Sequence, residues 1–212
     1  MIRVKICGIS DVETALAAAD AGADAIGLVF APSRRRVTVD RAREIADALP
    51  PFVTKVGLFV DADAEQVLHH VETAGLEVVQ LHGSETPAFC AALRRPVIKA
   101  IRVKDASSLA AMDRYRVSAF LLDSYDPDVA GGTGRVFDWD LAARVNPYGA
   151  SRLGAGGPYR IILSGGLTPE NVTEAIARVH PYGVDVSSGV ETDGKKDPVK
   201  IREFIQRAKN SS

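Results

Sequence analysis

The sequence predicts a single α/β domain with the (β/α)8 TIM-barrel fold. Short runs of β-branched residues alternate with alanine-rich amphipathic stretches along all 212 residues. Late in the chain two of these runs, residues 161–166 and 184–189, each end in a glycine-rich turn. TIM barrels build a phosphate site from the loops after their seventh and eighth strands. A doubly wound open sheet, the rival architecture, explains neither eight units nor the late turns.

Eight strands are expected, each a run of aliphatic and β-branched residues. They cover residues 3–6, 25–30, 53–59, 78–81, 97–101, 119–122, 160–163 and 183–186. The eight stretches between and after them, such as residues 11–21 and 39–49, carry apolar residues at helical spacing and often begin with a capping Asp, Ser or Thr. Thr168-Pro169-Glu170-Asn171 predicts a helix start, with Thr168 as the cap and Pro169 at the first helical position.

Residues 1–212 are expected to form one domain, because no linker divides the strand and helix pattern. Most loops must be short in a barrel of this length. Residues 147–158, rich in Gly, Pro and Ser, are the exception. This stretch follows a helix rather than a strand, so we expect a surface insertion on the face opposite the active end.

Composition narrows the class of protein. With 46% hydrophobic residues, 25% charged residues and a net charge of −1, the chain suits a compact enzyme and not a nucleic-acid binder. It has no apolar run long enough for a membrane span and no signal-peptide pattern, so we expect a cytoplasmic protein. Cys7 and Cys90 lie in no CxxC pattern, which fits a reducing compartment and gives no metal signature. No strong exposed apolar patch can be read, which favours a monomer over a homodimer.

The two late turns read Ser164-Gly165-Gly166 and Ser187-Ser188-Gly189. Backbone N–H groups can close on phosphate oxygens where no Cβ intrudes, which is what glycine allows. Either sequence alone is an ordinary turn signal. The pair, in this order, predicts a phosphorylated small-molecule substrate.

Two strand ends carry reactive side chains. Alternation along the first strand turns Cys7 and Lys5 toward the barrel interior and leaves Val4 and Ile6 to meet the helices. Asp123 ends the sixth strand, where a carboxylate is costly to bury without a partner or a task. The alternatives are that Cys7 is a small buried apolar residue and that Asp123 caps the following loop.

Three further features lie at the active end. The arginines at positions 34–36 either grip an anionic substrate or form a solvated face. His82, at the end of the fourth strand, is more typical of a structural residue than of a catalytic one. Residues 125–135 include the glycines of Gly131-Gly132-Thr133-Gly134 and predict a flexible lid, because GGTG without a following Lys is no P-loop.

Seven motifs stand in the order typical of one enzyme family. They are Lys5-Ile6-Cys7-Gly8, residues 33–37, Gln80-Leu81-His82-Gly83, Leu121-Leu122-Asp123, Gly131-Gly132-Thr133-Gly134 with Phe137-Asp138-Trp139, Ser164-Gly165-Gly166-Leu167, and residues 185–191. On these residues the chain resembles the phosphoribosylanthranilate isomerases over nearly its whole length. It departs from them at Arg34, where the family usually has proline, and in the insertion, which touches no motif. Alignment on Ser33 and Val37 makes Arg35 the family arginine, with Arg36 as its substitute.

The resemblance implies a cofactor-free Amadori rearrangement in tryptophan biosynthesis. An aldose–ketose isomerase of this family converts N-(5-phosphoribosyl)anthranilate to 1-(2-carboxyphenylamino)-1-deoxyribulose 5-phosphate. Asp123 resembles the general acid, which burial helps to keep protonated, and Cys7 the general base, which a nearby cation such as Lys5 favours as thiolate. Arg35 would hold the anthranilate carboxylate and Asp185 would hydrogen-bond the substrate. The expected phosphate ligands are Gly165, Gly166, Ser187, Ser188 and Gly189.

Three alternatives stay open on the sequence. The related isomerase of histidine biosynthesis resembles a two-aspartate site, and Cys7 stands where its first aspartate would. A Schiff-base lyase or aldolase needs an active-end lysine, for which Lys99 is the candidate. A catalytically silent phosphate-binding barrel would keep both glycine turns and lose the acid and the base.

Overall fold

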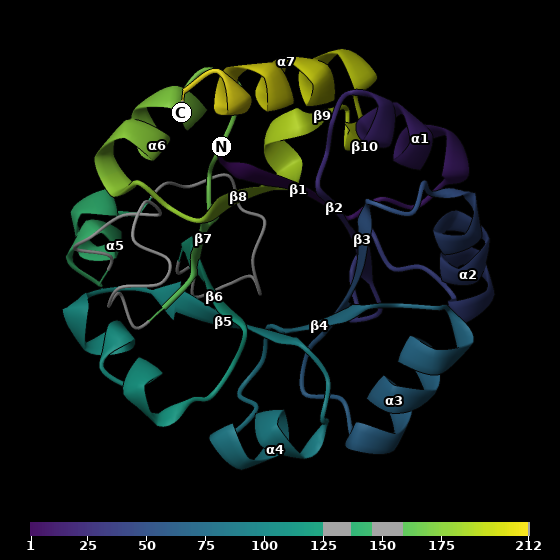
Figure 1. Ribbon diagram of the computed structural model, residues 1–212, viewed down its shortest axis with the longest axis horizontal. Coiled ribbons are helices and arrows are strands. Elements are labelled where there is room, and N and C mark those ends of the chain that lie inside the picture. Colours follow the sequence, from purple (N-terminus) through teal and green to yellow (C-terminus); the bar gives the residue numbers. More distant parts are fainter. Residues whose placement is uncertain (125–136, 146–158, 212) are drawn as a thin grey trace.

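The chain forms a closed barrel of eight parallel strands, each hydrogen-bonded to the next and β8 to β1 (Figure 1). This computed structural model describes residues 1–124, 137–145 and 159–211. The predicted barrel and its eight strands are confirmed, whereas the expected lid and surface insertion lie outside the described residues. The strands are β1 (Arg3–Cys7), β2 (Ala25–Val29), β3 (Thr54–Phe59), β4 (Val78–Leu81), β5 (Val97–Val103), β6 (Ala119–Ser124), β7 (Ile161–Leu163) and β8 (Gly183–Val186).

Helices surround the barrel as an outer ring (Figure 1). They are α1 (Val12–Asp20), α2 (Val39–Ala48), α3 (Ala64–Thr73), α4 (Pro87–Ala92), α5 (Trp139–Val145), α6 (Val172–Val179) and α7 (Pro198–Lys209). In the described part of the chain, none is long and apolar enough to cross a membrane.

The expectation of a regular helix after every strand is wrong for the fifth unit. Two 3-10 turns, η1 (Ala106–Leu109) and η2 (Met112–Arg114), stand between β5 and β6. The Asp105 carboxylate accepts from the backbone N–H groups of Ser107 and Ser108 at 2.9 and 3.3 Å. The Ser108 hydroxyl accepts in turn from the Asp105 N–H at 3.4 Å. Such side-chain bonds satisfy the backbone locally and compete with a continuous α-helix.

The start of α6 also differs from the prediction. The Thr168 hydroxyl accepts from the Glu170 N–H at 3.2 Å, so it caps a turn, while the helix itself begins only at Val172. Asn171 explains the delay, because its amide donates to the Gly166 carbonyl at 2.8 Å and its side-chain oxygen accepts from the Thr168 N–H at 2.8 Å. These bonds tie the turn after β7 to the helix that follows it.

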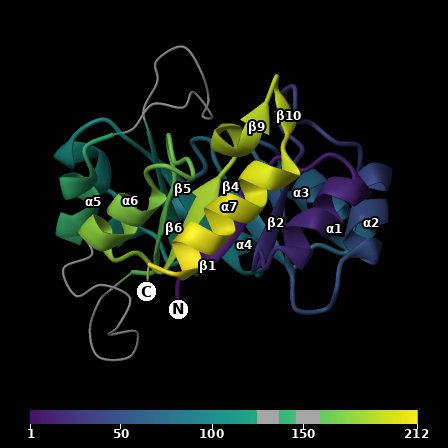
Figure 2. The same ribbon diagram turned by 90° about the horizontal axis from the view of Figure 1, so that it is seen from above.

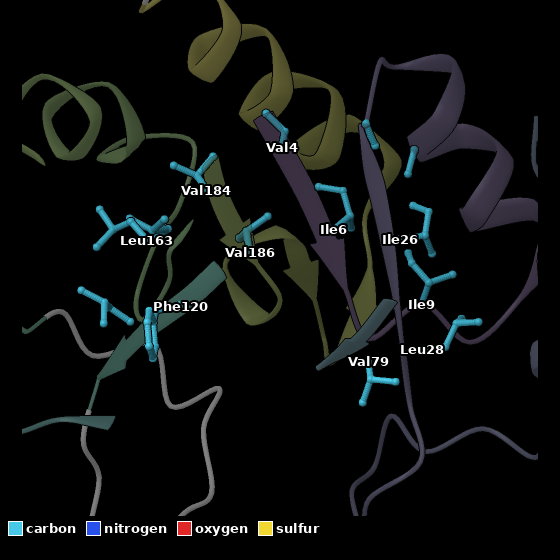
Figure 3. Packing of buried hydrophobic residues seen from close by; sticks show 14 of the residues in the cluster. Val4, Ile6, Ile9, Ile26, Leu28, Val79, Phe120, Leu163, Val184 and Val186 are labelled. Atoms are coloured by element: carbon cyan, nitrogen blue, oxygen red, sulfur yellow. The ribbon is translucent and has the colours of Figure 1, made fainter. Parts of the chain in front are cut away.

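The hydrophobic core lies mainly between the barrel and the helices. Val4 and Ile6 on β1 and Val184 and Val186 on β8 are almost fully buried there (Figure 3). Because successive strand residues face opposite sides, the residues between them point into the barrel. A second cluster of buried apolar residues lies inside the barrel and consists of Val56, Ile98, Ala100, Ala119, Leu121 and Ile162.

The two ends of the barrel are different. The N- and C-termini lie at one end, and the short hairpin of β9 (Glu191–Thr192) and β10 (Lys195–Lys196) stands at the other (Figure 2). The hairpin follows β8 after one short 3-10 turn, η4 (Ser188–Val190), so it marks the end where the strands finish. TIM-barrel active sites are built at this end.

Candidate active site

A hollow of about 110 Å³ opens at the end of the barrel where the strands finish. It is lined by residues of β1, β2, β3, β4, β6 and β8 and of the loops after β2, β3, β4, β7 and β8. Every site residue predicted from the sequence lines it: Cys7, Arg35, Asp123, Gly165, Gly166, Asp185, Ser187, Ser188 and Gly189. Residues far apart in the chain therefore meet in one place.

Cys7 lies on the inner face of β1 and packs with Val29, Ala31 and Leu58 at the barrel mouth. Its position depends on Gly27, the paired residue on β2. A Cβ at Gly27 would lie 2.9 Å from the Cys7 sulfur and 2.8 Å from the Lys5 ammonium. Gly27 was not predicted from the sequence, because a glycine inside a strand indicates that another group approaches closely but does not identify that group.

Lys5 and Asp185 form an ion pair inside the barrel. Their charged atoms are 2.8 Å apart, and the side chains are only 4% and 6% exposed. The pair spans the seam where β1 and β8 close the barrel, since the two residues are partners in the strand register. The Ser164 hydroxyl donates to the other Asp185 oxygen at 3.3 Å. The carboxylate of Asp185 is thus held by groups from β1 and from the end of β7.

The environment of Cys7 favours the thiol in the unliganded protein. Burial raises the pKa of Cys7, and the negative charge of Asp185 raises it further. The ammonium groups of Lys5 and Lys196 lower that pKa, but the net shift is upward. Lys5 alone therefore does not produce the expected thiolate, because its charge is shared with Asp185.

Asp123 lies beside His82 in the wall of the hollow. One Asp123 oxygen accepts from the Ser124 N–H at 2.9 Å, and the other lies 3.2 Å from His82 Nε2. Gln80 lies 3.4 Å from His82 Nδ1 on the far side of the ring. The carboxylate thus caps its own loop and also faces the site. His82 and Gln80 line the hollow, although His82 was expected to be structural.

Arg35 reaches the hollow from the loop after β2 and is held by Glu191. Its guanidinium donates to both carboxylate oxygens, at 2.7 and 3.0 Å. Arg34 also donates to Glu191, but its side chain is 58% exposed and lies outside the lining. Arg36 is exposed and likewise does not line the hollow. Among the three arginines, Arg35 is therefore the one placed to meet a ligand.

The two glycine turns pack against each other at the edge of the hollow. Gly165 and Gly166 have positive φ angles of 81° and 68°, which favour glycine. A Cβ at Gly165 would lie 3.0 Å from the Asp123 carboxylate, and one at Gly189 would collide with the Leu167 carbonyl. Both turns can thus approach a ligand with bare backbone.

Lys99 does not serve the hollow. It shares the outer face of β5 with the buried core residues Val97 and Val103. Its ammonium donates to the Gly83 carbonyl at 2.7 Å and to the Glu85 carboxylate at 2.9 Å, and both charged side chains are 3% exposed. A lysine held in this way offers no amine for a Schiff base. Nor do the described residues contain a cluster of three or more His, Cys, Asp or Glu suited to a metal ion.

Comparison with known proteins shows close relatives. Residues 4–207 match the family model of N-(5'phosphoribosyl)anthranilate isomerase. An isomerase of that name from Pelobacter propionicus is 55% identical, and the match covers all of this chain and 97% of the relative. The crystal structure of phosphoribosyl anthranilate isomerase from Thermotoga maritima matches at a TM-score of 0.89 and 42% identity, covering 99% of this chain and all of that one. A crystal structure of such an isomerase with reduced 1-(o-carboxyphenylamino)-1-deoxyribulose 5-phosphate matches at a TM-score of 0.83 and 42% identity, with the same coverage.

Replacing Lys99 tests its structural role. Lys99→Met leaves the buried Glu85 carboxylate without its cation, so we expect the free energy of unfolding to fall by about 3–5 kcal/mol in urea titrations. The kcat of the folded protein should stay close to that of the parent. Lys55→Met is the matched control, because Lys55 lies 3.5 Å from a half-exposed Glu77 and its loss should cost at most about 1 kcal/mol. A selective loss of kcat in Lys99→Met would contradict this structural role and indicate that Lys99 takes part in the reaction.

Proposed function

The chain belongs to the N-(5′-phosphoribosyl)anthranilate isomerase family, and we propose that Cys7 and Asp123 are the base and the acid of its reaction. The protein is thus an aldose–ketose isomerase of tryptophan biosynthesis, which performs an Amadori rearrangement of N-(5′-phosphoribosyl)anthranilate. The observation that carries the residue roles is the shared hollow. Cys7 from β1 and Asp123 from β6 both line it, between Arg35 and the two glycine turns. The family match favours this isomerase over the three alternatives, which were the isomerase of histidine biosynthesis, a Schiff-base lyase or aldolase, and a catalytically silent barrel.

The proposed reaction moves protons between two side chains and one substrate. Asp123 donates a proton to the furanose ring oxygen as the C1′–O bond breaks, and the nitrogen lone pair forms the C1′=N bond of a protonated Schiff base. The Cys7 thiolate then removes the proton from C2′, which gives an enolamine. Loss of the C2′ hydroxyl proton and gain of a proton at C1′ complete the aminoketose. Atoms and electrons balance with no external oxidant or reductant.

The two ends of the substrate carry the charges that the hollow is built to receive. Arg35 is proposed to bind the anthranilate carboxylate, because guanidinium and carboxylate groups match in geometry. The backbone N–H groups of the two turns, Gly165-Gly166 and residues 187–189, are proposed to bind the 5′-phosphate. Asp185, whose oxygens face Lys5 and Ser164, is proposed to accept a hydrogen bond from a sugar hydroxyl. A phosphorylated ligand of the family is supported by the isomerase complex with the reduced product analogue.

The remaining proposals concern the whole protein. We propose that residues 1–212 act as one catalytic domain in the cytoplasm, with a small phosphorylated molecule as the partner. The closed barrel, formed by strands from both halves of the chain, supports a single domain.

The state of assembly is open to a direct test. The monomer expected from the sequence stays a prediction, while one described feature favours a homodimer. Phe52 is 96% exposed beside a cavity of about 470 Å³ at the other end of the barrel, and the T. maritima isomerase is described as dimeric. Sedimentation velocity should give the mass of one chain for wild type and for Phe52→Asp. A wild-type species of twice that mass, halved by Phe52→Asp, would establish the dimer.

Substitution of the acid and the base tests the mechanism. We expect Cys7→Ser and Asp123→Asn each to lower kcat by about 10²-fold or more, since a positioned acid or base contributes about 10²–10⁴. Turnover is followed by the loss of substrate fluorescence, and circular dichroism checks the fold. Cys90→Ser, at the buried position of helix α4, is the control for cysteine loss in general. Near-parental turnover in Cys7→Ser would remove the thiolate from the mechanism.

The pH dependence follows from the raised pKa of Cys7. A base acts when deprotonated, so a raised pKa moves the acidic limb of kcat/KM toward higher pH. We expect the residual kcat/KM of Asp123→Asn, in which the carboxyl group of the acid is absent, to rise steadily from pH 7 and to level off only above the ordinary thiol pKa of about 8.5. Measurements start at pH 7 because the substrate phosphate, with a second pKa of about 6, is already mainly dianionic there. A flat profile of Asp123→Asn between pH 7 and 9 would contradict the assignment of Cys7 as the base.

The arginine loop offers a comparison of neighbours. Arg35→Ala should raise KM by about 10-fold or more, since a charge-assisted hydrogen bond contributes about 1.5–3 kcal/mol. Arg34→Ala and Arg36→Ala should change KM by less than about twofold, because both side chains are exposed and neither lines the hollow. Equal effects of all three substitutions would mean that the summed positive charge, and not Arg35, attracts the carboxylate.

A further inference from the structure

The β9–β10 hairpin stands beside the active end of the barrel (Figure 2). It carries a buried charge pair. Glu191 and Lys196 face each other in the register of the hairpin. Their charged atoms are 2.8 Å apart, and both side chains are 5% exposed. Neither residue lines the hollow. Lys196 is thus a buried lysine that lies next to the active site but does not line the hollow, so its role requires an explanation.

Lys196 bonds to the turn that follows β8. Its ammonium donates to the Ser187 carbonyl at 2.8 Å, to the Ser187 hydroxyl at 3.2 Å and to Glu191 at 2.8 Å. The Ser187 hydroxyl donates onward to the Cys7 carbonyl at 3.0 Å. Three elements are therefore joined in a row: the hairpin, the turn proposed to bind phosphate, and the end of β1.

The charge of Lys196 is not needed to neutralise Glu191. That carboxylate already accepts three hydrogen bonds from Arg34 and Arg35. A third cation in the cluster leaves a surplus of positive charge, and burying an ammonium costs free energy unless it gains something in return. Lys5, the other cation near Cys7, has its charge largely cancelled by Asp185. Lys196 therefore brings positive charge to the side of the site where a thiolate and a phosphate are proposed.

We propose that Lys196 is a positioning residue of the isomerase reaction, which holds the Ser187 turn against β1 and favours the ionised form of Cys7. The inference rests on the proposed roles of Cys7 and of the turn. The charged groups around Cys7 are Lys5 on β1, Asp185 on β8 and Lys196 on β10, and the two lysines lower its pKa while Asp185 raises it. Burial lowers the pKa of Lys196, Glu191 and Cys7 raise it, and Arg35 lowers it, with a net shift downward.

The hairpin supplies its own control for the test. Lys195 is the neighbouring residue, but its side chain is exposed. Lys196→Met and Lys195→Met are made in a Cys90→Ala background, so that Cys7 is the sole thiol. The rate of Cys7 alkylation by iodoacetamide is measured against pH, and turnover is measured in parallel.

Lys196→Met should move the midpoint of Cys7 alkylation upward by about one pH unit and lower kcat/KM at pH 7 by about tenfold. Lys195→Met should leave both unchanged. Lys196→Arg keeps the positive charge, so its alkylation midpoint should stay near that of the parent. If Lys196→Met does not fold, Lys196→Gln, which can still bond to Ser187, is read in the same way.

An unmoved alkylation midpoint in the folded Lys196 variant would overturn the proposal, whatever the turnover. An equal shift of the alkylation midpoint in Lys195→Met would also overturn the proposal, because the effect would then arise from the positive charge of the surface in general. The alkylation readout does not require Cys7 to be catalytic. Parental turnover in Cys7→Ser would therefore refute the proposed base and leave the measurement on Lys196 interpretable.

Discussion

Closure of the barrel between β1 and β8 is the constraint on which the site depends. The register places Lys5 opposite Asp185, and the two charges meet at 2.8 Å inside the barrel. Cys7 lies two residues beyond Lys5 and Ser187 two residues beyond Asp185, so the same register brings the thiol beside the glycine turn. Replacing buried ion pairs with apolar residues is often neutral or stabilising, so we interpret this pair as fixing the position of the seam more than as adding stability.

Glycines at the active end of the barrel leave space that side chains from neighbouring strands and loops occupy. Gly27 leaves room for both Lys5 and Cys7, while Gly8 leaves room for the Arg35 side chain. Gly165 lets the turn after β7 approach the Asp123 carboxylate, and Gly189 lets the two turns touch. At these positions, polar groups from different strands converge where the backbone between them carries no Cβ. The glycines are thus part of the same geometry as the charged residues.

The parts that could be predicted from the sequence are those with local signals. Alternation along β1 correctly turned Lys5 and Cys7 inward, and the apolar runs located all eight strands. Local signals failed where side chains compete with a helix, as around Asp105, and where a residue's partner lies far along the chain. Lys99 could be recognised as structural only through Glu85, and His82 as part of the site only through Asp123. Lys196 gave no signal, because an adjacent pair of lysines ordinarily predicts a solvated surface.

The chemistry places two opposing demands on Cys7. As the proposed base, Cys7 must be buried to meet C2′ away from water, yet burial raises the pKa of its thiol and reduces the fraction that is ionised. A higher pKa also makes the thiolate a stronger base, so the rate depends on the product of the ionised fraction and the basicity. Cations close to Cys7 shift this balance toward ionisation without exposing the sulfur to solvent. The charge of Lys5 is offset by Asp185. We therefore propose that the surplus charge at Lys196 lets the site keep a buried base that still ionises.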